Sequence, residues 1–596
     1  MKKSFKTRLC AVGLAALMLV GAGMTSIGSY AGTEISASAV TQYTTSGEYV
    51  YTDFKNTGRA ILKYLGNDTD VVIPSQLDGV DVSEICDYTF TDCTNLRSVT
   101  IPKTVKCITV TTFNVCGTLS SIFVDENNQY FSSKDGILYN KDQSVIRCYP
   151  SNHTGSESVT VPDSVTEIGN CAFYKCSNLK SISLPDNLTI IGYDSFVKCD
   201  NLTSIDIPKN VTTINNYAFQ GCTSLTSFKI PPKVTTINED VFDGCTSLTS
   251  IEVDKDSTAL TSDNGVLYSK DKKNLIRYPL AKKDTSFTVP EGVETIAACA
   301  FRDCKNLKSV AVSEGVKKIW GYAFGDCHNL SSVKLADSIE EIGWGVFDDC
   351  IGLTDLVLPK NLNYIGSLAF SGCENLSSLI TSNNITDSGF SLFYDCKKLV
   401  VYGEKNTYME TYAKKSNVSF APKEIVYGGT ADIFCGSSEW NKEYTFAVYY
   451  KQSTATKWTT AQKYSENREV SFKPKHTGIY NVCIRAKDAD GHVTKKIFNI
   501  TVNPTLKNTS EVSVNSIKLG KSVSVTAAST GGLGEKVYEV FYKNSTQTKW
   551  TKAQSYSSNT ALTIKPKHTG KYTICVKAKD ERGKAVNKNL TVEVTK

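Results

Sequence analysis

The stretch Val211-Thr-Thr-Ile-Asn-Asn-Tyr-Ala-Phe219-Gln-Gly-Cys222-Thr-Ser-Leu225 contains the pattern that decides the fold. Its phenylalanine recurs every 23 residues within each block, at Phe90, Phe113, Phe173, Phe196, Phe219, Phe242, Phe301, Phe324, Phe347, Phe370 and Phe393. A cysteine follows each phenylalanine by three residues, and a leucine follows the cysteine by three more. A unit of 23 residues cannot bury an apolar face alone, whereas stacked copies can. The repeat therefore predicts a solenoid.

Each repeat has two parts that differ in their apolar spacing. After the leucine, an I-x-I-P segment alternates apolar and other residues, which predicts a short strand that the proline ends. The A-F-x-x-C segment fits one helical turn on the other side of the coil. Stacking then places the strands of successive coils side by side in a parallel sheet.

The quoted stretch resembles the BspA-type, or Treponema-type, leucine-rich repeat, and the resemblance covers roughly residues 47–421. It implies a mainly β fold, in which a leucine-rich-repeat solenoid of parallel strands and short helical turns spans residues 40–421. The family occurs on secreted and surface proteins of bacteria and some protists. Its members act mainly through binding, as adhesins for host or matrix proteins or for other cells.

Two inserts interrupt the period, at about residues 125–155 and 255–285. We expect β-hairpins there, with polar turns at Lys141-Asp142 and Lys270-Asp271. We also expect caps at the ends of the solenoid, because an open edge invites aggregation. Residues 47–75 alternate like strands, and Tyr408 to Lys415 fits a short closing helix.

Eleven of the twenty cysteines occupy one repeat position, so they form a ladder in the stacked coils. Their side chains point in parallel directions, which disfavours disulfides between neighbours. We interpret them as free, buried and small apolar residues. A metal array or a redox chain is the alternative.

The strand residues that flank the inward isoleucines point outward, onto what we expect to be the concave sheet. One outward column is nearly all serine, with Asp355 as the exception, and the next column varies from coil to coil. The candidate binding residues are Thr100, Phe123, Asp206, Lys229, Glu252, Lys334 and Asp355. The alternative is a solvated face without a ligand.

The first 39 residues have the pattern of a secretory signal peptide. Four basic residues precede the apolar run from Leu9 to Met24, and Ala37-Ser-Ala39 provides a cleavage site. An uncleaved anchor is the alternative. No later stretch has the apolar length of a membrane span. We expect an extracellular protein, secreted or associated with the cell surface.

The last third contains two copies of a different module, offset by 92 residues. Lys457-Trp458 matches Lys549-Trp550, and His476-Thr-Gly matches His568-Thr-Gly. Short alternating segments with frequent turns predict two β-sandwiches, at residues 422–503 and 504–596. The pattern resembles the triple-tyrosine or immunoglobulin-like modules of secreted Firmicute proteins.

Several residues of these modules have two interpretations. Cys435 and Cys483 either form a disulfide between sheets or are two free core cysteines. Trp458 and Trp550 either stack on a glycan or pack in the core. The repeated histidines, His476 and His568, lack a second metal ligand and fit turns. Asp488 and Asp490 suggest calcium, but Arg582 replaces Asp490 in the second copy.

Charge divides unequally along the chain. Residues 421–596 contain 28 lysines and arginines and 14 acidic residues, a net charge of +14, which leaves −8 for the first 420 residues. A basic tail can attach to anionic cell-wall polymers by Coulomb attraction. A lysine-rich surface without a partner is the alternative. The overall net charge of +6 is too small to indicate nucleic-acid binding.

The sequence lacks the common catalytic motifs, such as H-E-x-x-H, G-x-S-x-G and the P-loop. We therefore predict no enzyme activity, no metal and no cofactor. The favoured function is a non-enzymatic binding protein whose solenoid recognises a protein or a cell surface, with the tail as spacer or wall attachment. The first alternative is an accessory glycan-binding protein that uses the tail. A hydrolase with a carboxylate pair under the insert hairpins is the other.

Overall fold

The computed structural model describes residues 43–53, 58–91, 93–114, 116–436 and 443–596. The predicted signal peptide at residues 1–39 lies outside these ranges. The chain forms two compact units. One runs to Gly352 and includes Ile365–Phe370, and the other comprises Leu353–Tyr364 and Ser371–Lys596.

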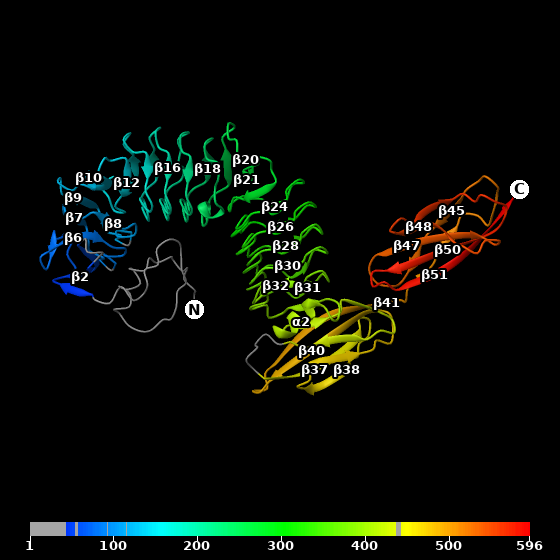
Figure 1. The fold of residues 1–596 in the computed structure, drawn as a ribbon. Helices are drawn as coiled ribbons and strands as arrows, with labels where there is room; N and C mark the ends of the chain where they lie inside the picture. The colour runs from blue at the N-terminus through cyan, green and yellow to red at the C-terminus, as the bar shows by residue number, and fades with distance from the viewer. Residues whose placement is uncertain (1–42, 54–57, 92, 115, 437–442) are drawn as a thin grey trace. The chain divides into compact units, whose positions relative to one another are not determined.

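The first unit is a solenoid with two rows of parallel strands (Figure 1). The predicted row uses the segment after each leucine, and its strands pair residue for residue, as Ser309 does with Ser332. These strands are β4 (Asp70–Val72), β7 (Ser98–Ile101), β9 (Ser121–Val124), β13 (Ser158–Thr160), β15 (Ser181–Ser183), β18 (Ser227–Ile230), β19 (Ser250–Val253), β23 (Ser286–Thr288), β25 (Ser309–Ala311) and β27 (Ser332–Lys334).

The second row of strands was not predicted. It uses the two residues that end at the isoleucine of the V-T-x-I segment, whose side chain is buried. Two-residue strands are too short to produce an alternating pattern in the sequence. They are β8 (Cys107–Ile108), β14 (Glu167–Ile168), β16 (Ile190–Ile191), β17 (Thr213–Ile214), β24 (Thr295–Ile296), β26 (Lys318–Ile319) and β28 (Glu341–Ile342).

The predicted helical turn at A-F-x-x-C is wrong for most coils. Among the described coil residues, only Glu239–Phe242 (η2) is helical, as a 3₁₀ turn. In most of the other coils the phenylalanine lies between two residues with left-handed backbone, as Phe324 lies between Tyr322 (φ 54°) and Asp326 (φ 59°). A right-handed helix cannot contain such residues, so the segment forms successive turns instead.

The phenylalanines and cysteines form the core of the stacked coils. Neighbouring rings lie nearly parallel, with centroids 5.3 Å apart for Phe196 and Phe219 and 5.0 Å apart for Phe301 and Phe324. All eleven ladder cysteines are buried thiols outside any disulfide, as predicted. Many also donate a hydrogen bond to the phenylalanine carbonyl of the preceding coil. The distance from Cys199 Sγ to the Phe173 oxygen is 3.2 Å.

Each insert contains the expected antiparallel pair, β11 with β12 around Lys141-Asp142 and β21 with β22 around Lys270-Asp271. One further strand precedes each pair, so the insert is a three-stranded meander. The additional turns, Asp135-Gly136 and Asn264-Gly265, have positive φ angles at both residues, as a type I′ turn requires. The third strand of each meander then joins the second row in parallel. The strands are β10 (Phe131–Lys134), β11 (Ile137–Asn140) and β12 (Val145–Cys148), then β20 (Leu260–Asp263), β21 (Val266–Ser269) and β22 (Asn274–Arg277).

Antiparallel strands begin the solenoid, which confirms the alternation predicted for the first cap. Tyr49 of β2 pairs with Tyr64 of β3, and β3 pairs in parallel with β6. The strands are β1 (Thr44–Ser46), β2 (Tyr49–Asp53), β3 (Arg59–Tyr64), β5 (Gln76–Leu77) and β6 (Val80–Ile85).

In the second unit, one sheet continues from the last coils into the first tail module. Its strands are β29 (Asp355–Val357), β31 (Ser378–Ile380), β33 (Val400–Tyr402), β34 (Ser419–Ala421), β36 (Ala431–Phe434) and β39 (Glu469–Phe472). Residue 421 was the predicted end of the solenoid, yet Phe420 of β34 pairs with Phe434 of β36. A fragment cut at residue 421 would lose this pairing. Two further short strands are β30 (Tyr364–Ile365) and β32 (Asp387–Ser388).

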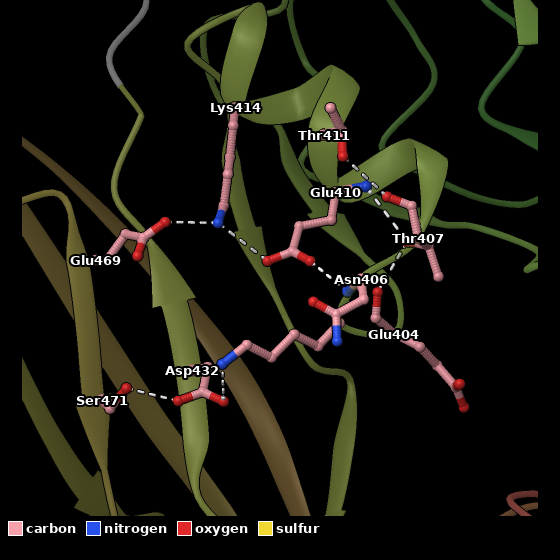
Figure 2. A network of polar contacts seen from close by, with 10 residues as sticks. Glu404, Asn406, Thr407, Glu410, Thr411, Lys414, Asp432, Glu469 and Ser471 are labelled. Carbon is pink, nitrogen blue, oxygen red and sulfur yellow. Dashed lines mark hydrogen bonds and ion pairs between the residues drawn. The ribbon is translucent and has the colours of Figure 1, made fainter.

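The predicted closing helix is α2 (Tyr408–Lys415), and Figure 2 shows how side chains attach it to the module. Its N-cap Thr407 accepts a hydrogen bond from the Glu410 amide, as serine and threonine caps do. At the other end, Lys414 lies 3.2 Å from Glu410 and 2.6 Å from Glu469 of β39. The helix therefore covers the end of the coil stack and also contacts the next module.

Each tail module contains a five-stranded sheet, and corresponding strands are offset by 92 residues as predicted. The first sheet has β35 (Glu424–Val426), β37 (Tyr444–Gln452), β38 (Thr459–Ser465), β40 (Gly478–Asp488) and β41 (Val493–Asn503). The second has β44 (Ser516–Lys518), β47 (Lys536–Asn544), β48 (Thr551–Ser557), β50 (Gly570–Asp580) and β51 (Ala585–Thr595). Smaller sheets contain β42 (Lys507–Asn508), β43 (Glu511–Val512), β45 (Val523–Thr526), β46 (Ser529–Thr530) and β49 (Ala561–Ile564).

None of the helices in the described part of the chain has the length and apolar character that a membrane crossing requires.

Candidate functional site

The candidate binding residues of the coil strands lie in separate groups. Thr100 and Phe123 are neighbours across β7 and β9, and Lys229 and Glu252 are neighbours across β18 and β19. Lys334 lies in β27. Asp355 lies in β29 of the other unit. Asp206 lies in a segment that forms no strand, so the sheet is interrupted at that coil.

Most of these side chains are exposed, but the strand face is not one continuous surface. Lys229 lies 3.3 Å from Asp254, which partly neutralises it. At the inserts, two serines of the outward serine column pack closely against glycines of the insert turns. A β-carbon at Gly136 would lie 2.9 Å from Ser121 Oγ, and one at Gly265 would lie 2.9 Å from Ser250 Oγ. A small residue is needed at these two serine positions.

Exposed and partly exposed aromatic residues gather at a place that the repeat pattern did not predict. Trp320, Tyr322 and Trp344, here called the aromatic edge, follow the second-row strands of two adjacent coils. Trp320 is 46% exposed and Trp344 is 49% exposed. Tyr193 and Tyr217 lie exposed in the same segment of two earlier coils.

The aromatic edge is held in a defined arrangement. The rings of Tyr322 and Trp344 meet edge to face, with centroids 4.4 Å apart. A β-carbon at Gly345 would lie 2.6 Å from the Tyr322 ring, so only glycine leaves room there. Arg302 lies 5.2 Å from the Tyr322 ring and Lys318 lies 5.5 Å from the Trp320 ring. The edge thus combines aromatic faces with positive charge.

Ion pairs with partly buried carboxylates hold the Arg302 side chain in place. Arg277, at the end of the second insert, is only 1% exposed, and its guanidinium lies 3.1 Å from Asp243. Arg302 lies 3.6 Å from Asp243 and donates to Asp326 at 3.1 Å. The insert therefore contributes a buried cation that the coils neutralise.

A carboxyl group with an unusual pKa lies in the same coil segment as Tyr193. Burial raises the pKa of Asp194 to about 6, and the negative charge of Asp240 adds to this shift. Asp240 accepts a hydrogen bond from Asn216 at 3.1 Å. The burial that shifts the pKa belongs to the packing of the coils, so we interpret Asp194 as structural.

The tail tryptophans are exposed, so core packing is the wrong alternative for them. Trp458 is 41% exposed and Trp550 is 42% exposed. A lysine lies over each indole, Lys451 at 5.3 Å and Lys543 at 5.1 Å from the ring centroid. Trp458 lies between β37 and the edge strand β38, and Trp550 lies at the equivalent place between β47 and the edge strand β48.

A shallow pocket of about 280 Å³ lies beside Trp458. It is lined by Tyr449, Trp458, Cys483, Arg485, Lys495 and Ile497. Strand alternation explains this set, because Tyr480, Val482 and Ile484 of β40 point into the core and the residues between them point outward. The pocket therefore lies on the outer face of the five-stranded sheet.

The same alternation separates the two candidate disulfide partners. Cys435 packs in the core of the module, whereas Cys483 lines the pocket on the outer face. Both thiols are free. The expectation of two core cysteines is thus correct only for Cys435, and the sheet lies between the two residues.

Possible metal ligands occur at one turn of the tail. Asp488, Asp490 and His492 place ligand atoms within 4.8 Å of one another, but the group is largely exposed and Asp488 accepts from the His492 amide at 2.8 Å. An exposed acidic turn of this kind does not by itself indicate a metal. The His476 amide donates to Tyr480 Oη at 3.0 Å, which agrees with a role in the turn.

The family model of the BspA type leucine rich repeat region matches residues 55–140, 145–264 and 281–400, which together exceed half of the chain. The chain belongs to the BspA-type leucine-rich repeat family. Membership suggests a role in binding or recognition.

Solved structures of bacterial leucine-rich repeat proteins are similar to this BspA-type chain. A leucine-rich cell surface protein from Faecalibacterium prausnitzii is 28% identical, covers 63% of this chain and 98% of its own, and has a TM-score of 0.43. The pneumococcal vaccine antigen PcpA is 22% identical over 63% and 96%, with a TM-score of 0.37. A Bacteroides ovatus leucine-rich repeat protein is 23% identical over 63% and 98%, with a TM-score of 0.35. No curated protein matches the chain.

The BspA-type pattern accounts for the phenylalanine, cysteine and leucine positions of the coils. The position after the second-row isoleucine varies in this chain, as glycine, asparagine, alanine, threonine or tryptophan from coil to coil. The tail after residue 400 lies outside the family match. The aromatic edge and the Trp458 pocket are therefore features beyond the repeat scaffold.

Proposed function

We propose that the protein is an exported, non-enzymatic binding protein whose solenoid recognises a protein on another cell or in the surrounding matrix. The observation that carries this proposal is the aromatic edge. Two half-exposed tryptophans and a tyrosine stand on adjacent coils, with Arg302 and Lys318 beside them. Tryptophan, tyrosine and arginine dominate the binding energy of protein interfaces.

The strand residues chosen from the sequence remain secondary candidates. Lys229, Glu252 and Lys334 are charged and exposed, and charges at the rim of an interface mainly affect association rate. We therefore expect them to adjust binding that the aromatic edge provides. Thr100, Phe123, Asp206 and Asp355 belong to the same secondary set.

The test uses the full chain against immobilised fibronectin, fibrinogen and laminin. We expect binding to at least one of them, with a loss of about tenfold or more in the double variant Trp320→Ala, Trp344→Ala. The variant Trp458→Ala, Trp550→Ala is the matched control, because it removes two equally exposed indoles from the tail. Binding that is absent for all three proteins, or equal in both double variants, contradicts the proposal.

We propose that residues 422–503 and 504–596 are immunoglobulin-like modules that space or attach the solenoid, in an extracellular protein of a Firmicute-like bacterium. A second candidate function belongs to this tail. The exposure of Trp458 and Trp550 favours an accessory role in glycan binding, because stacking requires an accessible indole face. The net charge of +14 favours an anionic glycan, such as a cell-wall polymer.

A further inference from the structure

The two five-stranded tail sheets consist of corresponding strands, so their outer faces can be compared residue by residue. In the first module, Tyr449, Cys483 and Ile497 are neighbours across β37, β40 and β41. In the second, Phe541, Cys575 and Asn589 occupy these places. Trp458 lines one pocket with the first row, and Trp550 occupies the equivalent sequence position in the second module.

Positive groups surround the pocket of the first module. Arg485 lies 5.3 Å from the Tyr449 ring, and Lys451 lies 5.3 Å from the Trp458 ring. Lys495 is the direct cross-strand neighbour of Arg485. Like charges in such positions destabilise a sheet unless an anion lies near them.

No carboxylate neutralises these cations within the part of the chain that the structure describes. The ion pairs of the described residues include none for Arg485, Lys495 or Lys451. The cross-strand neighbour of Arg485 on β37 is Ala447, which carries no charge. The pocket therefore offers an anion at least two unpaired cations beside aromatic rings.

The second module differs at this point. Glu539 replaces Ala447 as the cross-strand neighbour of the cation, here Lys577. Its carboxylate lies 2.9 Å from Lys552 and 3.8 Å from Lys577. Asn587 replaces Lys495. The second face thus keeps the exposed indole but has its cations neutralised internally.

We propose that the Trp458 pocket binds a sugar unit that carries a carboxylate or a phosphate, as part of an anionic polysaccharide. The indole of Trp458 stacks on the sugar ring, and Arg485 and Lys495 pair with the anionic group. The face at Trp550 lacks this selectivity because Glu539 occupies the position of the anion. The inference rests on the glycan-binding role proposed for the tail.

The test measures binding of the full chain to three polymers by isothermal titration calorimetry at low and high NaCl. Polygalacturonate presents carboxylates, poly(glycerol phosphate) teichoic acid presents phosphates, and dextran is neutral. We expect at least one anionic polymer to bind, binding to weaken as NaCl screens the charges, and dextran to bind about tenfold or more weakly. The stronger of the two anionic polymers identifies the charged group.

Reciprocal variants test the assignment of residues. Trp458→Ala and Lys495→Glu should each reduce anionic binding about tenfold, whereas Trp550→Ala should change it less than threefold. Ala447→Glu should reduce binding as Lys495→Glu does, and Glu539→Ala should increase it. Trp344→Ala is the matched control on the solenoid and should have no effect.

Equal binding of dextran, or equal losses in Trp458→Ala and Trp550→Ala, overturns the proposal. Unchanged binding in Lys495→Glu also overturns it, and this exposed substitution does not depend on packing. Binding of the same preparations to the matrix proteins keeps the two questions separate, because that readout depends on Trp320 and Trp344.

Discussion

The ladder thiol is the residue that best shows how the coils are joined. Cys327 Sγ donates to the Phe301 carbonyl of the preceding coil at 2.9 Å, and Cys222 Sγ donates to Phe196 at 3.2 Å. Burial raises the pKa of these thiols, so the thiolate does not form. The cysteine is small enough for the narrow space between coils and still provides a hydrogen-bond donor.

This environment predicts the pattern of thiol labelling in the native protein. Iodoacetamide at pH 8 should modify Cys107 slowly, because this thiol is exposed although partial burial raises its pKa, and should leave the ladder cysteines unmodified. All of them should react in guanidinium chloride. Mass spectrometry of the digested protein reads both states, and rapid native labelling of Cys199 or Cys222 would contradict the packing described.

The buried Arg277 predicts a large effect at Asp243. Asp243→Asn leaves this guanidinium without its anion, so we expect the free energy of unfolding to fall by about 3 kcal/mol. Glu157→Gln breaks the exposed pair with Lys180 and should cost below about 0.5 kcal/mol. Chemical denaturation followed by circular dichroism compares them. Similar losses in both variants would show that Arg277 does not depend on Asp243.

Asp194 predicts a dependence of stability on pH. Its pKa of about 6 lies above the value near 3.9 of an unfolded chain, so the folded state holds the proton more tightly. The resulting stability is complete below pH 4 and is lost as pH rises through 6. Asp194→Asn should therefore be more stable than the original protein at pH 7 and equally stable at pH 4. Thermal unfolding at both pH values checks this, and an equal difference at the two pH values would contradict it.

At the scale of elements, regular spacing determined what could be predicted. The strand after most repeat leucines, the antiparallel cap and the helix Tyr408–Lys415 all follow from apolar alternation or helical spacing. The second-row strands do not, because two residues give no pattern. The predicted helical turn failed because left-handed residues such as Tyr322 and Asp326 are not apparent from side-chain type.

The insert turns also had a signal that was overlooked. Asp135-Gly136 and Asn264-Gly265 are dipeptides that favour type I′ turns, and they join the additional strand to the pair expected around the later polar turns. Site residues were harder to identify. Trp458 was found from its repetition, but its exposure depends on which sheet face it borders. Trp320 lies in a coil segment whose orientation the repeat pattern does not reveal.

The insert turn yields a prediction about close packing. Gly265→Ala combines a positive φ with a contact to Ser250 Oγ at 2.9 Å, so we expect a loss of about 2 kcal/mol in unfolding free energy. Gly292→Ala is the control, with a positive φ and nothing within 4 Å. It should cost about 1 kcal/mol. Denaturant titration compares the two variants, and equal losses would mean that the serine contact has no effect.

At the scale of the whole molecule, net charge and exposed aromatic residues differ between the solenoid and the tail, which indicates different ligands for the two. The first 420 residues carry a net charge of −8 and the rest carry +14. The solenoid presents the aromatic edge without an excess of positive charge, whereas the tail combines exposed indoles with unpaired cations. Charge of this sign acts on anionic polymers at distances up to about 8 Å in physiological salt. Two kinds of ligand are therefore expected, one for each segment.

The measurement that tests this division most directly uses two variants of the full chain and two ligands. Binding to the matrix proteins and to polygalacturonate or teichoic acid is measured for Trp320→Ala, Trp344→Ala and for Trp458→Ala. The account predicts that the first variant loses only the protein ligand and the second loses only the anionic polymer. Loss of both ligands in one variant, or of neither in both, would contradict it.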